Sequence, residues 1–295
     1  MEWLPLALLA AFSVATADAL TKKGMQGVDG VEIVVVRFVF TGVLLAPLLA
    51  IQPLPAIPAA FWPWLAAMIP IEVAALWLYM IAIRDSPLAL TLPYLAFTPA
   101  FATVTGWAVL GERVSVQGFA GILVVVFGAY VLNAAAVTAP GRGWRRWLRP
   151  LGAIVRERGS RLMLTVAALY SITIVLGKGA LQHVPVTFFA PFFAVVLAVT
   201  VLVGFASVRP SLVRALWRRP GWHLAIGAAL AVSLLSHLFA LRLVEVAYMI
   251  AVKRTSLLFG ILYGAVLFRE AHLGRHLVGG TLMLAGVVLI ALASA

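Results

Sequence analysis

Residues 110–132 read LGERVSVQGFAGILVVVFGAYVL, and a related stretch, LFREAHLGRHLVGGTLMLAGVVLI, occupies residues 267–290. The two stretches carry a glutamate and two glycines at the same spacing. An offset of about 158 residues pairs Glu112 with Glu270, Gly121 with Gly279, Gly128 with Gly286, Ser13 with Ser171, and Ala82-Ile83-Arg84 with Ala240-Leu241-Arg242. Because this register holds across two complete apolar segments without a gap, it indicates an internal duplication.

The composition requires a lipid environment. The chain has 295 residues, of which 64% are hydrophobic and 11% charged, whereas a soluble domain has roughly 45–50% apolar and about 25% charged residues. Apolar stretches of about 20 residues, the length that crosses a bilayer as a helix, recur along the whole chain. The sequence therefore predicts an all-α membrane protein.

Turn residues and charges divide the apolar sequence into ten predicted transmembrane helices. They are expected at 3–21, 31–51, 62–83, 87–109, 114–134, 161–181, 187–206, 223–242, 245–268 and 273–293. The arginine-rich stretch 135–160 separates a first five-helix repeat, 1–134, from a second, 161–295. A repeat with an odd number of helices must sit in the opposite orientation to its copy, so the two repeats are predicted to be inverted.

The distribution of basic residues between alternate loops predicts the orientation. The loops on one side carry about 16 Lys and Arg, and those on the other carry about three. Basic loops stay on the cytoplasmic side during insertion, so both termini are predicted to be periplasmic in a multi-pass protein of a bacterial-type inner membrane. This placement also explains the formal charge of +12 without a nucleic-acid partner.

The sequence resembles the EamA-type drug/metabolite transporter superfamily. The resemblance is carried by the two related stretches, 110–132 and 267–290, and by Arg37-Phe38 within VVVRFVFTGVLL at 34–45. The likeness extends over essentially the whole chain. It implies secondary transport of amino acids, nucleotide sugars, quaternary amines or other small metabolites, commonly outward, through a central cavity between the repeats. Members of the family are often drawn with cytoplasmic termini, whereas the loop charges here predict periplasmic ones.

Ionisable residues inside predicted spans are the candidate functional residues, because each costs roughly 2.5–3.5 kcal/mol to insert at the bilayer centre. Glu72 is the strongest of them, since Trp77 and Tyr79 follow it on the same predicted helix. A carboxylate beside aromatic rings can bind a cation or take part in proton exchange. The alternative is a structural ion pair with Lys253, Arg254 or Arg37.

Lys253 and Arg254 are consecutive, so on a helix their side chains point about 100° apart and only one can face a given cavity. Lys253 is predicted to be the cavity residue. With Glu72 it would place one negative and one positive group at similar depth, which complements a zwitterion such as an α-amino acid.

Other candidates rest on weaker patterns. His237 aligns with Tyr79 under the repeat offset, and the two rings are predicted to shape a pocket, unless His237 makes an interhelical hydrogen bond. Arg37 is expected to snorkel or to pair with Asp18. Kinks are predicted in the fourth helix, at Pro93 and Pro99, and at the start of the seventh, at Pro185 and Pro191. Further residues expected to line the cavity are Tyr94, Ser236, Trp107 and Tyr263.

The predicted function is secondary transport of small polar metabolites, most of all amino acids, by alternating access and in the export direction. Two alternatives remain: a proton-coupled exporter of hydrophobic or quaternary cations, and a flippase for lipid-linked substrates or a membrane-embedded accessory protein. An enzyme is not expected, because phosphate-binding, nucleophile-elbow and zinc-protease motifs are missing. No cofactor or metal is predicted, cysteine is absent, and a monomer is compatible with the sequence.

Overall fold

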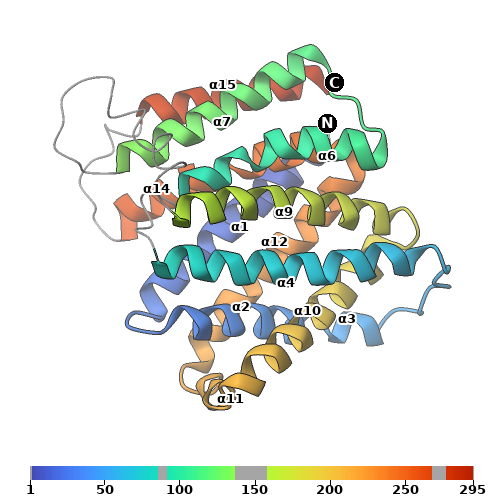
Figure 1. The fold of residues 1–295 in the computed structure, drawn as a ribbon, viewed down its shortest axis with the longest axis vertical. Coiled ribbons are helices and arrows are strands. Elements are labelled where there is room, and N and C mark those ends of the chain that lie inside the picture. Colours follow the sequence, from blue (N-terminus) through green and yellow to red (C-terminus); the bar gives the residue numbers. More distant parts are fainter. Residues whose placement is uncertain (1, 86–91, 137–157, 268–276, 295) are drawn as a thin grey trace.

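The computed structural model describes residues 2–85, 92–136, 158–267 and 277–294, and within them every regular element is helical. Figure 1 shows these helices as a layered bundle. The first half contains α1 (Trp3–Gly24), α2 (Gly30–Leu45), α3 (Pro47–Ala50), α4 (Phe61–Asp85), η1 (Leu92–Phe97), α6 (Thr98–Leu110) and α7 (Val116–Ala136). The second half contains α9 (Arg158–Leu181), α10 (Val186–Val208), α11 (Ser211–Ala215), α12 (Pro220–Leu243), α13 (Val246–Lys253), α14 (Ser256–Leu267) and α15 (Leu277–Ala293). Most of the predicted basic linker, the first residues of the fourth and last predicted spans, and Glu270 lie outside the described residues.

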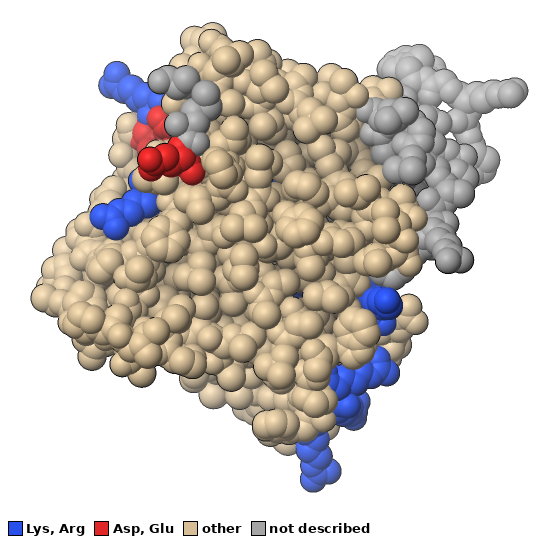
Figure 2. All heavy atoms as spheres, turned by 180° about the vertical axis from the view of Figure 1, so that it is seen from behind, with Lys and Arg blue, Asp and Glu red and all other residues tan. Residues whose placement is uncertain are grey.

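Seven segments of the described chain are long and apolar enough to cross a membrane. They are Trp3–Gly24, Gly30–Ala50, Phe61–Ala82, Arg158–Leu181, Val186–Val208, Pro220–Leu243 and Val246–Leu267. Three shorter apolar helices accompany them: Tyr94–Leu110, Val116–Leu132 and Val278–Ala293. On the face drawn in Figure 2, charged side chains gather at the margins and leave a broad uncharged surface between them. The predicted all-helical, multi-pass membrane class is therefore confirmed.

Several predicted spans are interrupted. The second divides at Ala46, before Pro47, because proline lacks the N–H that would continue the helix ladder. The fourth contains the 3-10 segment η1 before α6, as its prolines predicted. The ninth, expected to be continuous, breaks between α13 and α14, where the Thr255 hydroxyl donates to the Val252 carbonyl oxygen at 2.8 Å. The short helix α11 was not predicted.

Helix pairing brings the two halves of the chain together. The closest pairs are α7 with α15, α1 with α12, α4 with α9, and α2 with α10. Each of these pairs joins one helix from residues 2–136 to one from residues 158–294. The two halves of the described chain therefore pack against each other in one helical bundle.

Four glycines allow α7 and α15 to approach closely, side by side in Figure 1. A Cβ at Gly121 would lie 2.9 Å from the Gly286 carbonyl oxygen, and one at Gly128 would lie 2.8 Å from that of Gly279. The reverse contacts, from Gly286 to Gly121 and from Gly279 to Gly128, are 2.7 and 2.8 Å. Small residues at such a crossing are the usual means by which membrane helices bring their backbones into contact.

Replacing Gly128 with alanine is expected to lower the thermal midpoint of the solubilised protein, because the added methyl meets the Gly279 backbone. Overpacking of this kind costs about 1–3 kcal/mol. Gly204→Ala is the matched control, since nothing lies within 4 Å of a Cβ at Gly204 and alanine favours a helix over glycine by about 1 kcal/mol. Equal midpoints for the two variants would show that the glycine crossing does not limit stability.

The candidate functional site lies between α4 and α10. The two helices meet through aromatic rings at two levels: Phe61 with Phe189, with centroids 6.0 Å apart, and Trp77 with Phe205, at 6.2 Å. Between these levels their side chains leave a cavity, which α9, α12 and α13 complete.

Candidate functional site

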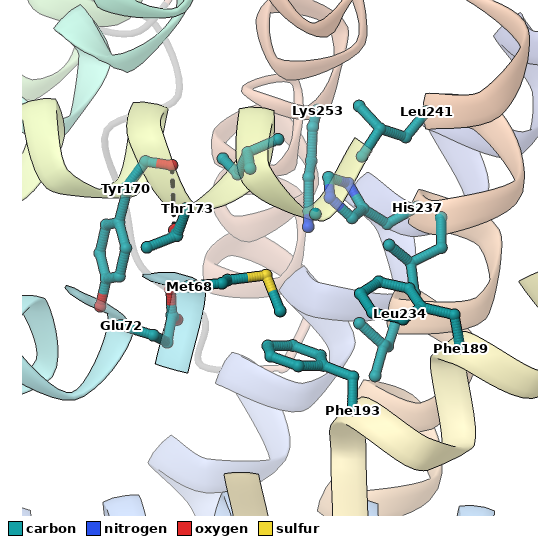
Figure 3. A pocket seen from close by; sticks show the side chains of 13 residues that line it. Met68, Glu72, Tyr170, Thr173, Phe189, Phe193, Leu234, His237, Leu241 and Lys253 are labelled. Carbon is teal, nitrogen blue, oxygen red and sulfur yellow. Dashed lines mark hydrogen bonds between the residues drawn. The ribbon is translucent and has the colours of Figure 1, made fainter. Parts of the chain in front are cut away.

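A cavity of about 220 Å³ lies between α4, α9, α10, α12 and α13. Figure 3 shows its labelled side chains pointing toward a common space. Its polar and ionisable lining residues are Glu72, Tyr170, Thr173, His237 and Lys253. The rest of the lining is apolar except for Gly177, and includes Met68, Phe189, Phe193 and Leu234.

Helical periodicity places these residues on shared faces. On α9, the lining residues Tyr170, Thr173, Ile174 and Gly177 follow the i, i+3, i+4, i+7 pattern of one helix face. On α12, Leu234, His237, Leu238 and Leu241 follow the same pattern. Glu72 stands one turn after Met68 on α4. Each of these helices therefore lines the cavity with one face.

The acidic wall consists of Glu72 with Tyr170 and Thr173. The Thr173 hydroxyl donates to the Tyr170 carbonyl oxygen at 3.2 Å and also faces the Glu72 carboxylate. Among the described residues Glu72 forms no salt bridge, and its electrostatic interaction with Lys253 acts across the cavity. Direct pairing with Arg37 or Arg254 is absent from the described chain as well. The carboxylate therefore lines the cavity beside Thr173 without a cation at salt-bridge distance in the described chain.

The basic wall consists of Lys253 and His237. Lys253 is the last residue of α13, and Figure 3 shows its side chain descending beside the His237 ring. Neither side chain has a hydrogen-bond partner within the part of the chain that the structure describes, and the His237 Nδ1 atom is buried without one. His237 itself is only 7% exposed. This wall therefore presents unused N–H donors toward the cavity.

Arg254 points away from the cavity, as the angle between consecutive helical residues requires. Its guanidinium donates to the Thr98 hydroxyl at 2.7 Å, and its Nε atom is buried without a partner in the described structure. Thr98 is the first residue of α6, and Arg254 follows the last residue of α13. The contact therefore joins the two points at which the fourth and ninth spans are interrupted.

The other predicted site residues lie elsewhere. Arg37 donates to Asp18 at 2.7 Å, and Tyr79 interacts electrostatically with both. Trp77 is 57% exposed and stacks on Phe205 beside a second cavity near Asp29.

Three further candidates do not line the central cavity either. Tyr94 is fully buried in a cluster with Met163 and Val166, and Ser236 is buried next to His237. The Tyr263 hydroxyl lies 2.7 Å from that of Thr16. Of the predicted substrate-binding residues, the structure brings Glu72, Lys253 and His237 together.

Sequence reasoning missed Tyr170, Thr173, Phe189 and Phe193. A signal existed for the first two, because a tyrosine and a threonine about one turn apart place two hydroxyl groups on one face of a predicted membrane helix. No signal distinguished the two phenylalanines from the many others, because aromatic residues are ordinary packing material in membrane helices.

A second polar group, formed by Glu112 and Lys178, closes the bundle at the ends of four helices. The Lys178 ammonium donates to the Glu112 carboxylate at 2.5 Å and to the Val244 carbonyl oxygen, just after α12, at 2.5 Å. The other Glu112 carboxylate oxygen accepts the Val246 N–H, at the start of α13, at 2.9 Å. The side chains of Lys178 and Glu112 are only 17% and 11% exposed. The sequence did not predict this ion pair, because Glu112 was considered there only as part of the repeated stretch and of a turn between spans.

A multi-pass helical bundle with a charged internal cavity is an architecture that membrane transporters of small solutes use. Residues 1–134 match the EamA-like transporter family, within the drug/metabolite transporter superfamily. The predicted resemblance is therefore confirmed on this half of the chain. The family consists of membrane transporters of small solutes and not of enzymes.

The fold as a whole also has a solved counterpart. A protein described only as "Crystal structure of protein" superimposes with a TM-score of 0.74 at 17% sequence identity, covering 99% of this chain and 96% of that one. At this identity the likeness concerns the fold alone. Among curated proteins, no sequence matches this chain.

Proposed function

We propose that this protein is a secondary transporter that moves small zwitterionic metabolites, amino acids above all, by alternating access. One observation carries the proposal: Glu72 and Lys253 line the same cavity from opposite walls without forming a salt bridge in the described structure. An α-amino acid would place its ammonium at Glu72 and its carboxylate at Lys253. Its side chain would then face Met68, Phe189 and Phe193, which favours apolar amino acids.

The transport cycle would use ten spans arranged as two inverted repeats, 1–134 and 161–295, joined by the linker 135–160. The reciprocal glycine contacts between α7 and α15 support a twofold relation, because exchanging the aligned glycines turns each contact into the other. The start of α6 at Thr98 and that of α14 at Ser256 also differ by about 158 residues. Rocking of one repeat against the other would expose the cavity alternately to each side.

The membrane and the direction of transport follow from charge and from family resemblance. The basic loops favour a bacterial-type inner membrane with both termini periplasmic. Outward movement is common in the family that the sequence resembles, so we expect export. Proteoliposomes loaded with radiolabelled amino acids provide the test. Efflux of apolar amino acids is expected, whereas transport of another solute and of no amino acid would refute the substrate class.

A second candidate function is proton-coupled export of hydrophobic cations. It is favoured by the Glu72 carboxylate, which lies among Tyr170, Met68 and Phe193. In that case Lys253 would have no substrate contact, and its positive charge would repel the substrate.

The Lys253→Met variant separates the two functions. For a zwitterionic substrate, loss of the ammonium is expected to reduce leucine transport by about ten- to hundred-fold, because a hydrogen bond to a charged group is lost. For a hydrophobic cation, transport would be unchanged or faster. Arg242→Gln, which removes an exposed charge near the end of α12, is the control for a general effect of losing a cation.

A further inference from the structure

The basic wall of the cavity contains a second donor group besides Lys253. His237 lies on the α12 face that lines the cavity, and it interacts electrostatically with Lys253. The ring is almost wholly buried, and within the described chain neither nitrogen is used in a hydrogen bond. A neutral imidazole always carries one N–H donor. Buried polar groups are normally satisfied, so an unused pair of donors here points to a ligand.

The opposite wall offers only oxygen atoms. Glu72 contributes a carboxylate, and Tyr170 and Thr173 contribute hydroxyl groups. The basic wall, by contrast, presents an ammonium and an imidazole with no carboxylate beside them among the described residues. The described lining therefore places a carboxylate on α4, two hydroxyl groups on α9, and the imidazole and ammonium on α12 and α13.

We propose that His237 and Lys253 together form a carboxylate subsite, in which the imidazole N–H and the ammonium bind the two oxygens of the substrate carboxylate. His237 is then a specificity-determining residue that selects acids over the corresponding amines. The role of this subsite in transport rests on the proposed function, because the substrate carboxylate belongs to the proposed amino acid. The subsite itself can nevertheless be tested without any transport.

Three matched probes separate the subsite from the rest of the cavity. Leucine carries an ammonium and a carboxylate, isopentylamine is leucine without its carboxylate, and isocaproate is leucine without its ammonium. Each is added to the purified, solubilised full chain, and affinity is obtained from the concentration dependence of thermal stabilisation. The wild-type protein is expected to bind leucine most tightly and to bind isocaproate measurably.

The His237→Phe variant retains a ring but has no N–H. It is expected to bind leucine and isocaproate about ten- to hundred-fold more weakly, as for a lost hydrogen bond to a charged group, and to bind isopentylamine as the wild type does. His237→Gln retains an N–H donor and should recover part of the loss. Val232→Ala, a 43% exposed position on the same helix, should leave the affinity for all three probes unchanged.

Two results would overturn the subsite. One is a wild-type protein that isocaproate does not stabilise, and the other is a His237→Phe variant whose affinities for leucine and isopentylamine fall by the same factor. Failure of the proposed function gives a different pattern. In that case isocaproate would still bind in a His237-dependent manner, but proteoliposomes would release no amino acid.

Discussion

Replacing Glu72 with glutamine is expected to abolish export of leucine from proteoliposomes. The substitution preserves the size of the side chain but removes the charge that would bind the substrate ammonium. Removing one partner of a buried charge pair costs about 3–5 kcal/mol, which corresponds to a loss of more than about 100-fold in affinity. Tyr170 and Thr173 are neutral and cannot replace the carboxylate.

Glu72→Gln should favour binding of the acid isocaproate over the amine isopentylamine, whereas His237→Phe should favour the amine over the acid. Glu72→Gln is expected to lose affinity for leucine and isopentylamine but to retain isocaproate, because the basic wall is intact. Glu245→Gln is a suitable control, since Glu245 makes no side-chain bond to the start of α13. A Glu72→Gln variant that still transports leucine at the wild-type rate would exclude Glu72 from the substrate site.

The central charges of the site could be identified from the sequence because ionisable residues inside membrane helices are rare and costly. Glu72, Lys253 and His237 stood out for that reason, and the angle between consecutive helical residues separated Lys253 from Arg254. The apolar residues that complete the cavity could not be identified from the sequence. Phe189 and Phe193 resemble every other apolar residue on α10, and only the packing of α10 beside α4 and α12 makes them part of the cavity.

The sequence offset predicted an internal duplication, but it did not predict which positions of the two stretches come into contact. The offset paired Gly121 with Gly279, whereas the contact in the structure joins Gly121 to Gly286. An alignment pairs positions of the two stretches, but it does not say which faces of the two helices pack together.

The break of the ninth span was missed because no proline or glycine marks it. At the break, the Thr255 hydroxyl and the Thr255 N–H both donate to the Val252 carbonyl oxygen, at 2.8 and 3.0 Å. This type of local competition with the helix ladder can be recognised only when the side-chain conformation is known. The break lies directly after Lys253, a predicted substrate-binding residue and the last residue of α13.

The Glu112–Lys178 pair is expected to contribute strongly to stability and to hold Lys253 in position. Lys178→Met leaves the Glu112 carboxylate buried without its cation, which costs about 3–5 kcal/mol. The thermal midpoint of the solubilised protein should therefore fall by of order 10 °C. Because Glu112 also accepts the first N–H of α13, and Lys253 ends that helix, affinity for isocaproate should fall as well.

A double-mutant cycle tests whether the two side chains act as a pair. Glu112→Gln removes the other charge, and the combined Glu112→Gln/Lys178→Met variant leaves neither charge unpaired. Its midpoint should therefore lie well above the value expected from adding the two single effects, because contacting residues are energetically coupled.

The exposed ion pair between Arg209 and Asp29 is the matched control, with side chains 50% and 47% exposed. Exposed pairs contribute only about 0–1 kcal/mol, so Arg209→Gln should shift the midpoint little. Equal shifts for Lys178→Met and Arg209→Gln, or additive effects in the cycle, would show that the buried pair does not hold these four helix ends together.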